Sequence, residues 1–146
     1  YKRQIQLFEA ALDKDGIAYK EYAIADTNEV QSVTTAAAGE CDVLYIPTDN
    51  TLASVTETVY NVVAPAKVPV IAGEEGICNG CGVATLSISY YDLGYATGEM
   101  AYEILAEGAD ITTMDVRYAP NVTKKYNAKI CEELGITVPD DYVAIQ

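Results

Sequence analysis

The sequence predicts an α/β fold with a mostly parallel sheet and helices on both faces. Segments with a helical spacing of apolar residues alternate with short segments that are almost entirely apolar. Short apolar runs such as 42–47 and 68–72 are typical of strands that are covered on both faces, as in a parallel sheet. Strands that alternate with helices form βαβ units, and 146 residues is the length of one domain.

In the first half of the chain, each predicted element has a local signal. Gly16 follows an amphipathic stretch and is placed to end a helix in the left-handed conformation. Asn28, with Gln31 three residues later, resembles a capping box, and Pro65 lies where a helix should stop. The predicted elements are a helix over 2–15, a strand over 17–25, a helix over 28–39, a strand over 42–47, a helix over 52–66 and a strand over 68–72.

The second half continues the alternation after a glycine-rich loop over 73–76. Its predicted elements are a strand over 83–89, a helix over 91–107, a strand over 113–118, a helix over 122–134 and an extended end over 136–139. In the helix over 91–107, the residues expected to point inward are Leu93, Met100, Ala101, Ile104 and Leu105. A chain that opens on a helix is unusual for this fold, so we expect a first strand before Tyr1, in the middle of the sheet. It is either absent from the chain or supplied by another chain.

Charge and composition disfavour several classes of function. Nine basic against 22 acidic residues give a net charge of −13, which repels nucleic acid and anionic membranes. The chain has no histidine, so Ser-His-Asp and Cys-His catalysis are excluded and most zinc and iron sites are disfavoured. No phosphate-binding loop or dinucleotide fingerprint occurs, and no apolar run approaches the ~20 residues of a membrane span. Asp49 with Glu74 is the one candidate acid–base pair, and we predict no catalytic residue, metal or cofactor.

The four cysteines are sparse for a disulfide scaffold. Cys41 and Cys131 are expected to be small buried hydrophobic residues. Cys78 and Cys81 form a CxxC that allows a redox pair, half a metal site or a local disulfide. We expect this CxxC to lie in a loop before a strand, whereas a thioredoxin-type pair opens a helix.

Three polar segments follow three predicted strands, at the edge of the sheet where ligands bind in open parallel folds. Together they supply carboxylates, an amide, hydroxyl groups and aromatic rings. Such groups suit a small ligand with an ammonium group and an apolar or aromatic body. The alternative for each is structural, as a helix cap, a solvated charge or packing at a strand end. The candidate ligand-binding residues are Thr48, Asp49, Asn50, Glu74, Glu75, Tyr90 and Tyr91, and we expect Asp49, Glu74 and Tyr91 to share one lip of the sheet.

Several motifs resemble a known family. Residues 42–51 are similar to the D-x-x-Y-x-P-T-D-N segment of ABC transporter substrate-binding proteins of the tryptophan/tyrosine type. Residues 88–94 resemble the family's Y-Y-x-L-G stretch, and 134–139 its L-G-I-x-I-P ending. The resemblance implies a type I periplasmic-binding-protein fold, in which two flavodoxin-like α/β/α lobes close on a small molecule. This chain looks like the C-terminal lobe without its first strand.

The resemblance also implies a division of the chain and a role for each candidate residue. Residues 1–120 would form the ligand-binding lobe, and residues 121–146 a helix and tail that belong to the hinge or the other lobe. Asp49 would contact a ligand amino group, Glu74 would lie on the acidic loop at the cleft edge, and a ring of Tyr90 or Tyr91 would cover the ligand. Cys41, Cys78 and Cys81 depart from the family pattern.

The implied function is delivery of an amino acid, aromatic ones included, to a membrane permease. Family proteins are extracytoplasmic and lipid-anchored, so the implied partners are a small ligand and a permease, without nucleic acid or direct membrane insertion. The main alternative is an effector-binding regulatory domain on the same fold, as in sugar-responsive repressors. A flavodoxin-like enzyme or a receiver domain is a third interpretation. A receiver needs a lysine at the end of a late strand, and the sequence has none there.

Overall fold

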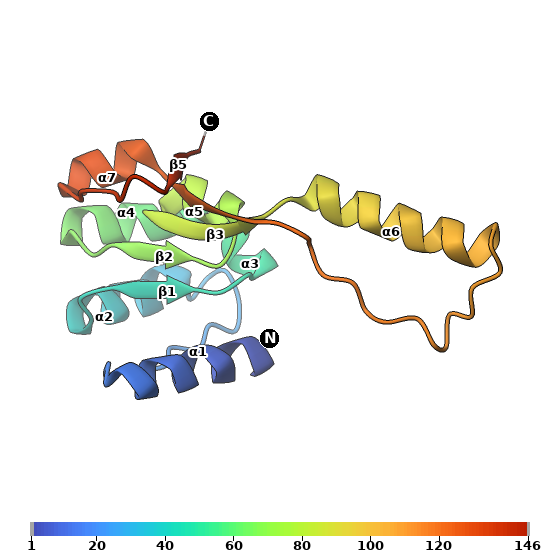
Figure 1. Cartoon of the computed structure of the whole chain (residues 1–146). Helices are drawn as coiled ribbons and strands as arrows, with labels where there is room; N and C mark the ends of the chain where they lie inside the picture. The colour runs from blue at the N-terminus through green and yellow to red at the C-terminus, as the bar shows by residue number, and fades with distance from the viewer. Residues whose placement is uncertain (1, 146) are drawn as a thin grey trace. The chain divides into compact units, whose positions relative to one another are not determined.

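The computed structural model describes residues 2–145, apart from the side chain of Lys2. The chain forms two compact units (Figure 1). Unit 1 joins Tyr1–Leu86 with Lys124–Gln146, and unit 2 is Ser87–Thr123. The expected boundary between residues 120 and 121 concerns the lobes of a larger binding protein and stays a prediction.

Helices and strands alternate along most of the chain, as the sequence predicts. The elements are α1 (Lys2–Asp15), α2 (Val30–Glu40), β1 (Leu44–Ile46), α3 (Asn50–Ala53), α4 (Thr56–Ala66), β2 (Val70–Ala72), α5 (Glu75–Cys81), β3 (Ala84–Ile88), α6 (Tyr90–Leu105), β4 (Val122–Tyr126), α7 (Ala128–Leu134) and β5 (Val143–Ala144). The five strands form one sheet in the order β1-β2-β3-β4-β5. The pairs β1–β2, β2–β3 and β4–β5 are parallel, which confirms the predicted α/β class with a mostly parallel sheet.

The core of unit 1 lies between the sheet and the helices on one of its faces. Its buried members come from α2, β1, α4, β2 and α5: Val30, Ile46, Val59, Val63, Val70, Ala72, Ile77, Cys78 and Cys81. On the other face of β1, the ring of Phe8 in α1 stacks on Tyr45 with ring centroids 4.0 Å apart. Tyr45 alternates with Leu44 and Ile46 along the strand, so helices cover β1 from both sides.

Two predicted strands are wrong. Neither residues 17–25 nor residues 113–118 contain a strand. Both stretches have the alternating pattern of a strand. A strand also needs a neighbour that takes its backbone hydrogen bonds, and neither stretch has one among the described residues.

The predicted helix over 122–134 is wrong in its first half, which is strand β4. Asn127 divides the strand from the helix. Its side chain accepts a hydrogen bond from the Ile130 N–H at 3.2 Å and caps α7, and its backbone N–H donates to the Val83 carbonyl at 3.0 Å. Gly16 follows α1 with φ +68°, which confirms the left-handed end predicted there, and Gly135 ends α7 with the same φ of +68°.

Other differences concern helix boundaries and faces. The predicted capping box at Asn28 is wrong, because α2 begins after Glu29 without a side-chain cap. The helix predicted over 52–66 is split into α3 and α4. Helix α6 has no fully buried residue: Leu93, Met100 and Ile104 are half-buried, whereas Ala101 and Leu105, predicted to point inward, are exposed. None of the helices that the structure describes has the length and apolarity needed to cross a bilayer.

Candidate ligand-binding site

The candidate site in unit 1 lies where β1 and β2 end. The segments that follow these strands touch through their backbones: Gly73 N–H donates to the Ile46 carbonyl at 2.7 Å, and the Thr48 hydroxyl donates to the Gly73 carbonyl at 3.2 Å. A Cβ atom at Gly73 would lie 2.6 Å from the Thr48 nitrogen. The absence of a side chain at Gly73 therefore allows the two polar segments to meet.

Asp49 caps helix α3 at this edge. Its Oδ1 accepts a hydrogen bond from the Leu52 N–H at 2.9 Å, and the residue is half-buried. Asn50 is the first residue of the helix and is exposed. Asp49 is therefore a helix cap, which is the structural alternative that the sequence left open for it. The cap uses one carboxylate oxygen and keeps the negative charge at the edge of the sheet.

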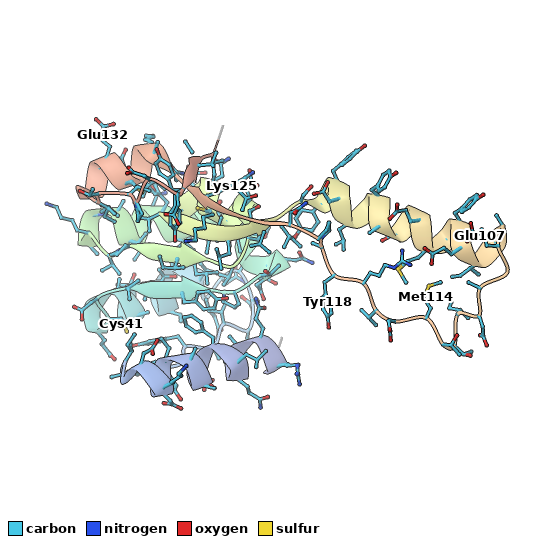
Figure 2. All side chains as sticks on the ribbon, viewed as in Figure 1. Cys41, Glu107, Met114, Tyr118, Lys125 and Glu132 are labelled. Atoms are coloured by element: carbon cyan, nitrogen blue, oxygen red, sulfur yellow. The ribbon has the colours of Figure 1, made fainter. Side chains whose placement is uncertain are left out.

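Glu74 caps the next helix. One of its oxygens accepts from the Gly76 N–H at 2.8 Å and the other from the Ile77 N–H. Glu75 pairs with Lys125, whose ammonium nitrogen lies 2.7 Å from Oε2. Lys125, which is labelled in Figure 2, belongs to β4. The two adjacent glutamates therefore have different partners, a helix end for one and a cation for the other.

Tyr90 and Tyr91 begin helix α6 in unit 2. Ser89 caps this helix by accepting a hydrogen bond from the Asp92 N–H at 3.1 Å. The two tyrosines are 61% and 80% exposed, which leaves their rings available to a ligand or to another part of the protein. The structure brings Thr48, Asp49, Asn50, Glu74 and Glu75 together in unit 1. The shared lip that was predicted to include Tyr91 stays a prediction.

Sequence reasoning missed Gly73 and Lys125 as members of this site. Gly73 had a usable signal, because a glycine directly after a buried strand often marks a close backbone approach. Lys125 had none, because its partner Glu75 lies 50 positions away in sequence and residue 125 was predicted to be helical.

The CxxC lies in helix α5, and its predicted place in a loop before a strand is wrong. Cys78 and Cys81 are 0% and 1% exposed, and burial raises the pKa of each thiol to about 12. Burial also raises the pKa of Cys131. All four cysteines are free thiols. In the part of the chain that the structure describes, no group of three or more Cys, Asp or Glu residues could hold a metal ion.

We predict that only one of the four thiols reacts rapidly with an aromatic disulfide reagent at pH 8. Cys41 is half-buried, whereas the other three are buried and protonated, and the thiolate is the reactive form. Absorbance of the released chromophore should show one fast equivalent in the folded protein and four in 6 M guanidinium. If a second thiol of the folded protein reacts fast, and this reaction is absent from a Cys78→Ala variant, the burial of the CxxC is contradicted.

Comparisons with known proteins agree with one another. The model of the family described as ABC transporter substrate binding protein matches residues 1–145. A tyrosine-binding protein of Clostridioides difficile (strain R20291) is 35% identical over 119 residues, which are 78% of this chain and 34% of that protein.

Solved structures give the same result. An ABC domain from Streptococcus pneumonia in complex with L-Trp is 33% identical with a TM-score of 0.85, over 95% of this chain and 47% of that one. A ligand-free, open substrate binding protein with adhesive properties from Clostridium difficile is 34% identical with a TM-score of 0.76, over 99% of this chain and 50% of that one.

A conserved domain protein from Vibrio cholerae is 30% identical with a TM-score of 0.86, again over 99% of this chain and 50% of that one. The chain thus spans a third of the curated relative and about half of each solved relative. With a family model that matches nearly every residue and relatives that share its fold, the chain belongs to the ABC transporter substrate binding protein family.

Proposed function

We propose that this chain is one lobe of a substrate-binding protein that holds an aromatic amino acid, tyrosine or tryptophan, for an ABC transporter. The contact between the segments after β1 and β2 carries the proposal, because it holds Asp49 and Glu74 at one edge of a parallel sheet. Ligands bind at this edge in open α/β folds. The relatives described as tyrosine-binding and as a complex with L-Trp support this choice of ligand.

In this proposal, the carboxylate of Asp49 pairs with the ligand ammonium. A charge-assisted hydrogen bond to an ammonium is stronger than a neutral one, so Asp49 contributes both affinity and orientation. Thr48 and Asn50 add a hydroxyl and an amide beside it, and Glu74 strengthens the negative field that attracts a cation. Glu75 is a proposed member of the site on the basis of the family resemblance, with its charge balanced by Lys125. Tyr90 and Tyr91 are proposed ring contacts on the basis of the family resemblance.

The proposal extends to the setting of the protein. It acts outside the cytoplasmic membrane, held there by a lipid anchor, and passes its ligand to a permease. Ligand binding shifts the protein from an open to a closed state by its preference for the closed one. No catalytic step is part of this function.

We predict that Asp49→Asn weakens binding of L-tyrosine or L-tryptophan by about 10- to 100-fold without loss of stability. Asparagine caps helices as well as aspartate does, so the hydrogen bond to Leu52 is kept while the charge is lost. Isothermal titration of the full-length protein measures the affinity, and thermal unfolding measures the stability.

Two further variants separate the possible roles of Asp49. Asp49→Ala removes both cap and charge, so it should weaken binding and also lower stability by about 1 kcal/mol. Asp15→Asn removes one exposed carboxylate at the end of α1 and should change neither. Equal affinity of Asp49→Asn and the parent protein would reject Asp49 as the ammonium contact. No heat with either amino acid in the parent protein would reject this ligand class.

A further inference from the structure

The candidate site holds more negative than positive charge. Asp49 and Glu74 accept hydrogen bonds from backbone N–H groups, and neither takes part in an ion pair that the structure describes. Glu75 is the third carboxylate, and its Oε2 lies 2.7 Å from the ammonium nitrogen of Lys125. The other ion pairs of the described residues join side chains outside the site. Among the described residues, Lys125 is therefore the one cation that an ion pair places beside these carboxylates.

Strand β4 and helix α5 fix the position of Lys125. Alternate residues of an extended chain point to the same side, so Lys125 and Asn127 are directed alike. The Asn127 side chain donates a hydrogen bond to the Asn79 carbonyl of α5 at 2.9 Å, and Lys125 reaches Glu75, the first residue of the same helix. Lys124 points the other way and pairs with a carboxylate of the C-terminal tail. The two adjacent lysines therefore have separate surroundings.

The ion pair of Lys125 is less exposed to water than the others. The Lys125 side chain is 27% exposed, whereas the cations of the other described ion pairs are between 39% and 79% exposed. Salt and water screen a partly buried charge less than an exposed one. The field of Lys125 therefore acts on a charged group that binds next to it.

A free amino acid brings two charges to this edge of the sheet. Its ammonium is attracted by carboxylates, and its own carboxylate is repelled by them. An aromatic amine such as tyramine has the same ring and the same ammonium but no carboxylate. A site with three uncompensated carboxylates would therefore bind the amine more tightly than the amino acid. A cation beside the carboxylates reduces the repulsion that only the amino acid experiences.

We propose that Lys125 is a specificity-determining residue, which makes the site select a zwitterionic aromatic amino acid over the aromatic amine with the same side chain. This inference rests on the proposed function. Lys125 cancels the charge of Glu75, and Asp49 remains to pair with the ligand ammonium. The ion pair thus sets the balance of charge at the site as well as fastening β4 to α5.

Isothermal titration of the full-length protein at pH 7 with L-tyrosine and tyramine, and with L-tryptophan and tryptamine, tests the proposal. The measured quantity is the ratio of the two dissociation constants in each pair. The parent protein should bind the amino acid more tightly. Lys125→Met keeps the length of the side chain and removes its charge, so it should reduce the preference for the amino acid by at least about fivefold.

Two variants control for the loss of packing and of net charge. Lys125→Arg keeps the positive charge and should keep the preference within about twofold of the parent value. Lys124→Met removes the same charge from the neighbouring position, which faces away from the site, and should also stay within about twofold. A purely structural role of Lys125 would weaken both ligands of a pair equally, and an unchanged ratio in Lys125→Met would overturn the proposal.

Glu75→Gln gives a test of opposite sign, which also serves if Lys125→Met does not fold. This variant removes a negative charge and leaves the Lys125 ammonium without that carboxylate, so the preference for the amino acid should rise. An unchanged or lower preference in Glu75→Gln would overturn the proposal.

The parent protein separates this inference from the proposed function. If it binds neither amino acid, the proposed function is rejected and the role of Lys125 with it. If it binds an amino acid and the matching amine equally well, the proposed function stands and the specificity role of Lys125 is rejected.

Discussion

Replacing Gly73 with alanine is expected to lower the free energy of unfolding by about 1–3 kcal/mol and to weaken ligand binding as well. The new Cβ would lie 2.6 Å from the Thr48 nitrogen, 2.8 Å from the Pro47 carbonyl carbon and 3.0 Å from the Pro47 Cα. All three are backbone atoms, so no side-chain rotation relieves the contact. The segment after β1 must move, and it carries Thr48 and Asp49.

Denaturant unfolding and isothermal titration of the same variant measure the two effects together. Gly39→Ala is the matched control. Gly39 lies in helix α2, and a Cβ atom added there would have no other atom within 4 Å. Gly39 is the second-to-last residue of α2, and alanine is favoured over glycine in a helix, so this control should lose no stability and should bind normally. A Gly73→Ala protein as stable as the parent would show that the two segments do not approach closely.

Local sequence signals predicted the part of the fold that depends on local physics. The strands β1 and β2 coincide with short apolar runs, and Gly16 follows a helix in the left-handed conformation as predicted. These features depend on burial, on β-branched side chains and on the conformational freedom of glycine. Each can be recognised within a few residues of sequence.

The errors come from patterns that fit two structures at once. Val122, Tyr126, Ile130 and Leu134 repeat every four residues, which indicates a helix, yet a repeat of four also fits a strand. Asn127 decides between them, because its side chain caps α7 and ends the strand at Tyr126. For residues 17–25, the alternating pattern indicated a strand without saying whether a neighbour is present.

The location of the site could be predicted from the sequence, but the hydrogen bonds and ion pairs of its residues could not. The rule that ligands bind at the carboxyl ends of parallel strands placed Asp49 and Glu74 in neighbouring segments, and the structure joins those segments through Thr48 and Gly73. The rule does not say what each carboxylate binds. The two hydrogen bonds that the Glu74 carboxylate accepts from backbone N–H groups depend on where α5 begins. The glycine-rich sequence indicated a loop there, so the start of this helix was not predicted.

The folded protein should lose stability steeply above pH 9. Burial raises the pKa of the Cys78 and Cys81 thiols to about 12, whereas thiols of an unfolded chain titrate near pH 8.5. Between these values the unfolded chain releases its thiol protons while the folded protein keeps them, so a rise in pH favours unfolding. Each thiol should lower the free energy of unfolding by about 1.4 kcal/mol per pH unit in this range.

Urea unfolding at pH 8, 9, 10 and 10.5 under reducing, oxygen-free conditions measures this slope. Tyrosine and lysine side chains also titrate in alkali, so the informative quantity is the difference between variants. Cys78→Ala and Cys81→Ala should each start from a lower stability, because both sulfur atoms are buried in the core of unit 1. Each variant should also lose about 1.4 kcal/mol per pH unit of the alkaline slope.

Cys41→Ala is the control for the alkaline slope. Cys41 is half-buried and lies outside the core of unit 1, so its removal should leave the slope unchanged. If Cys78→Ala and Cys81→Ala keep the full slope of the parent protein, the thiols of the CxxC are not held protonated by burial. An acidic thiol in this pair would instead make the parent protein more stable on going from pH 6 to pH 8, because the folded state would then release its proton first.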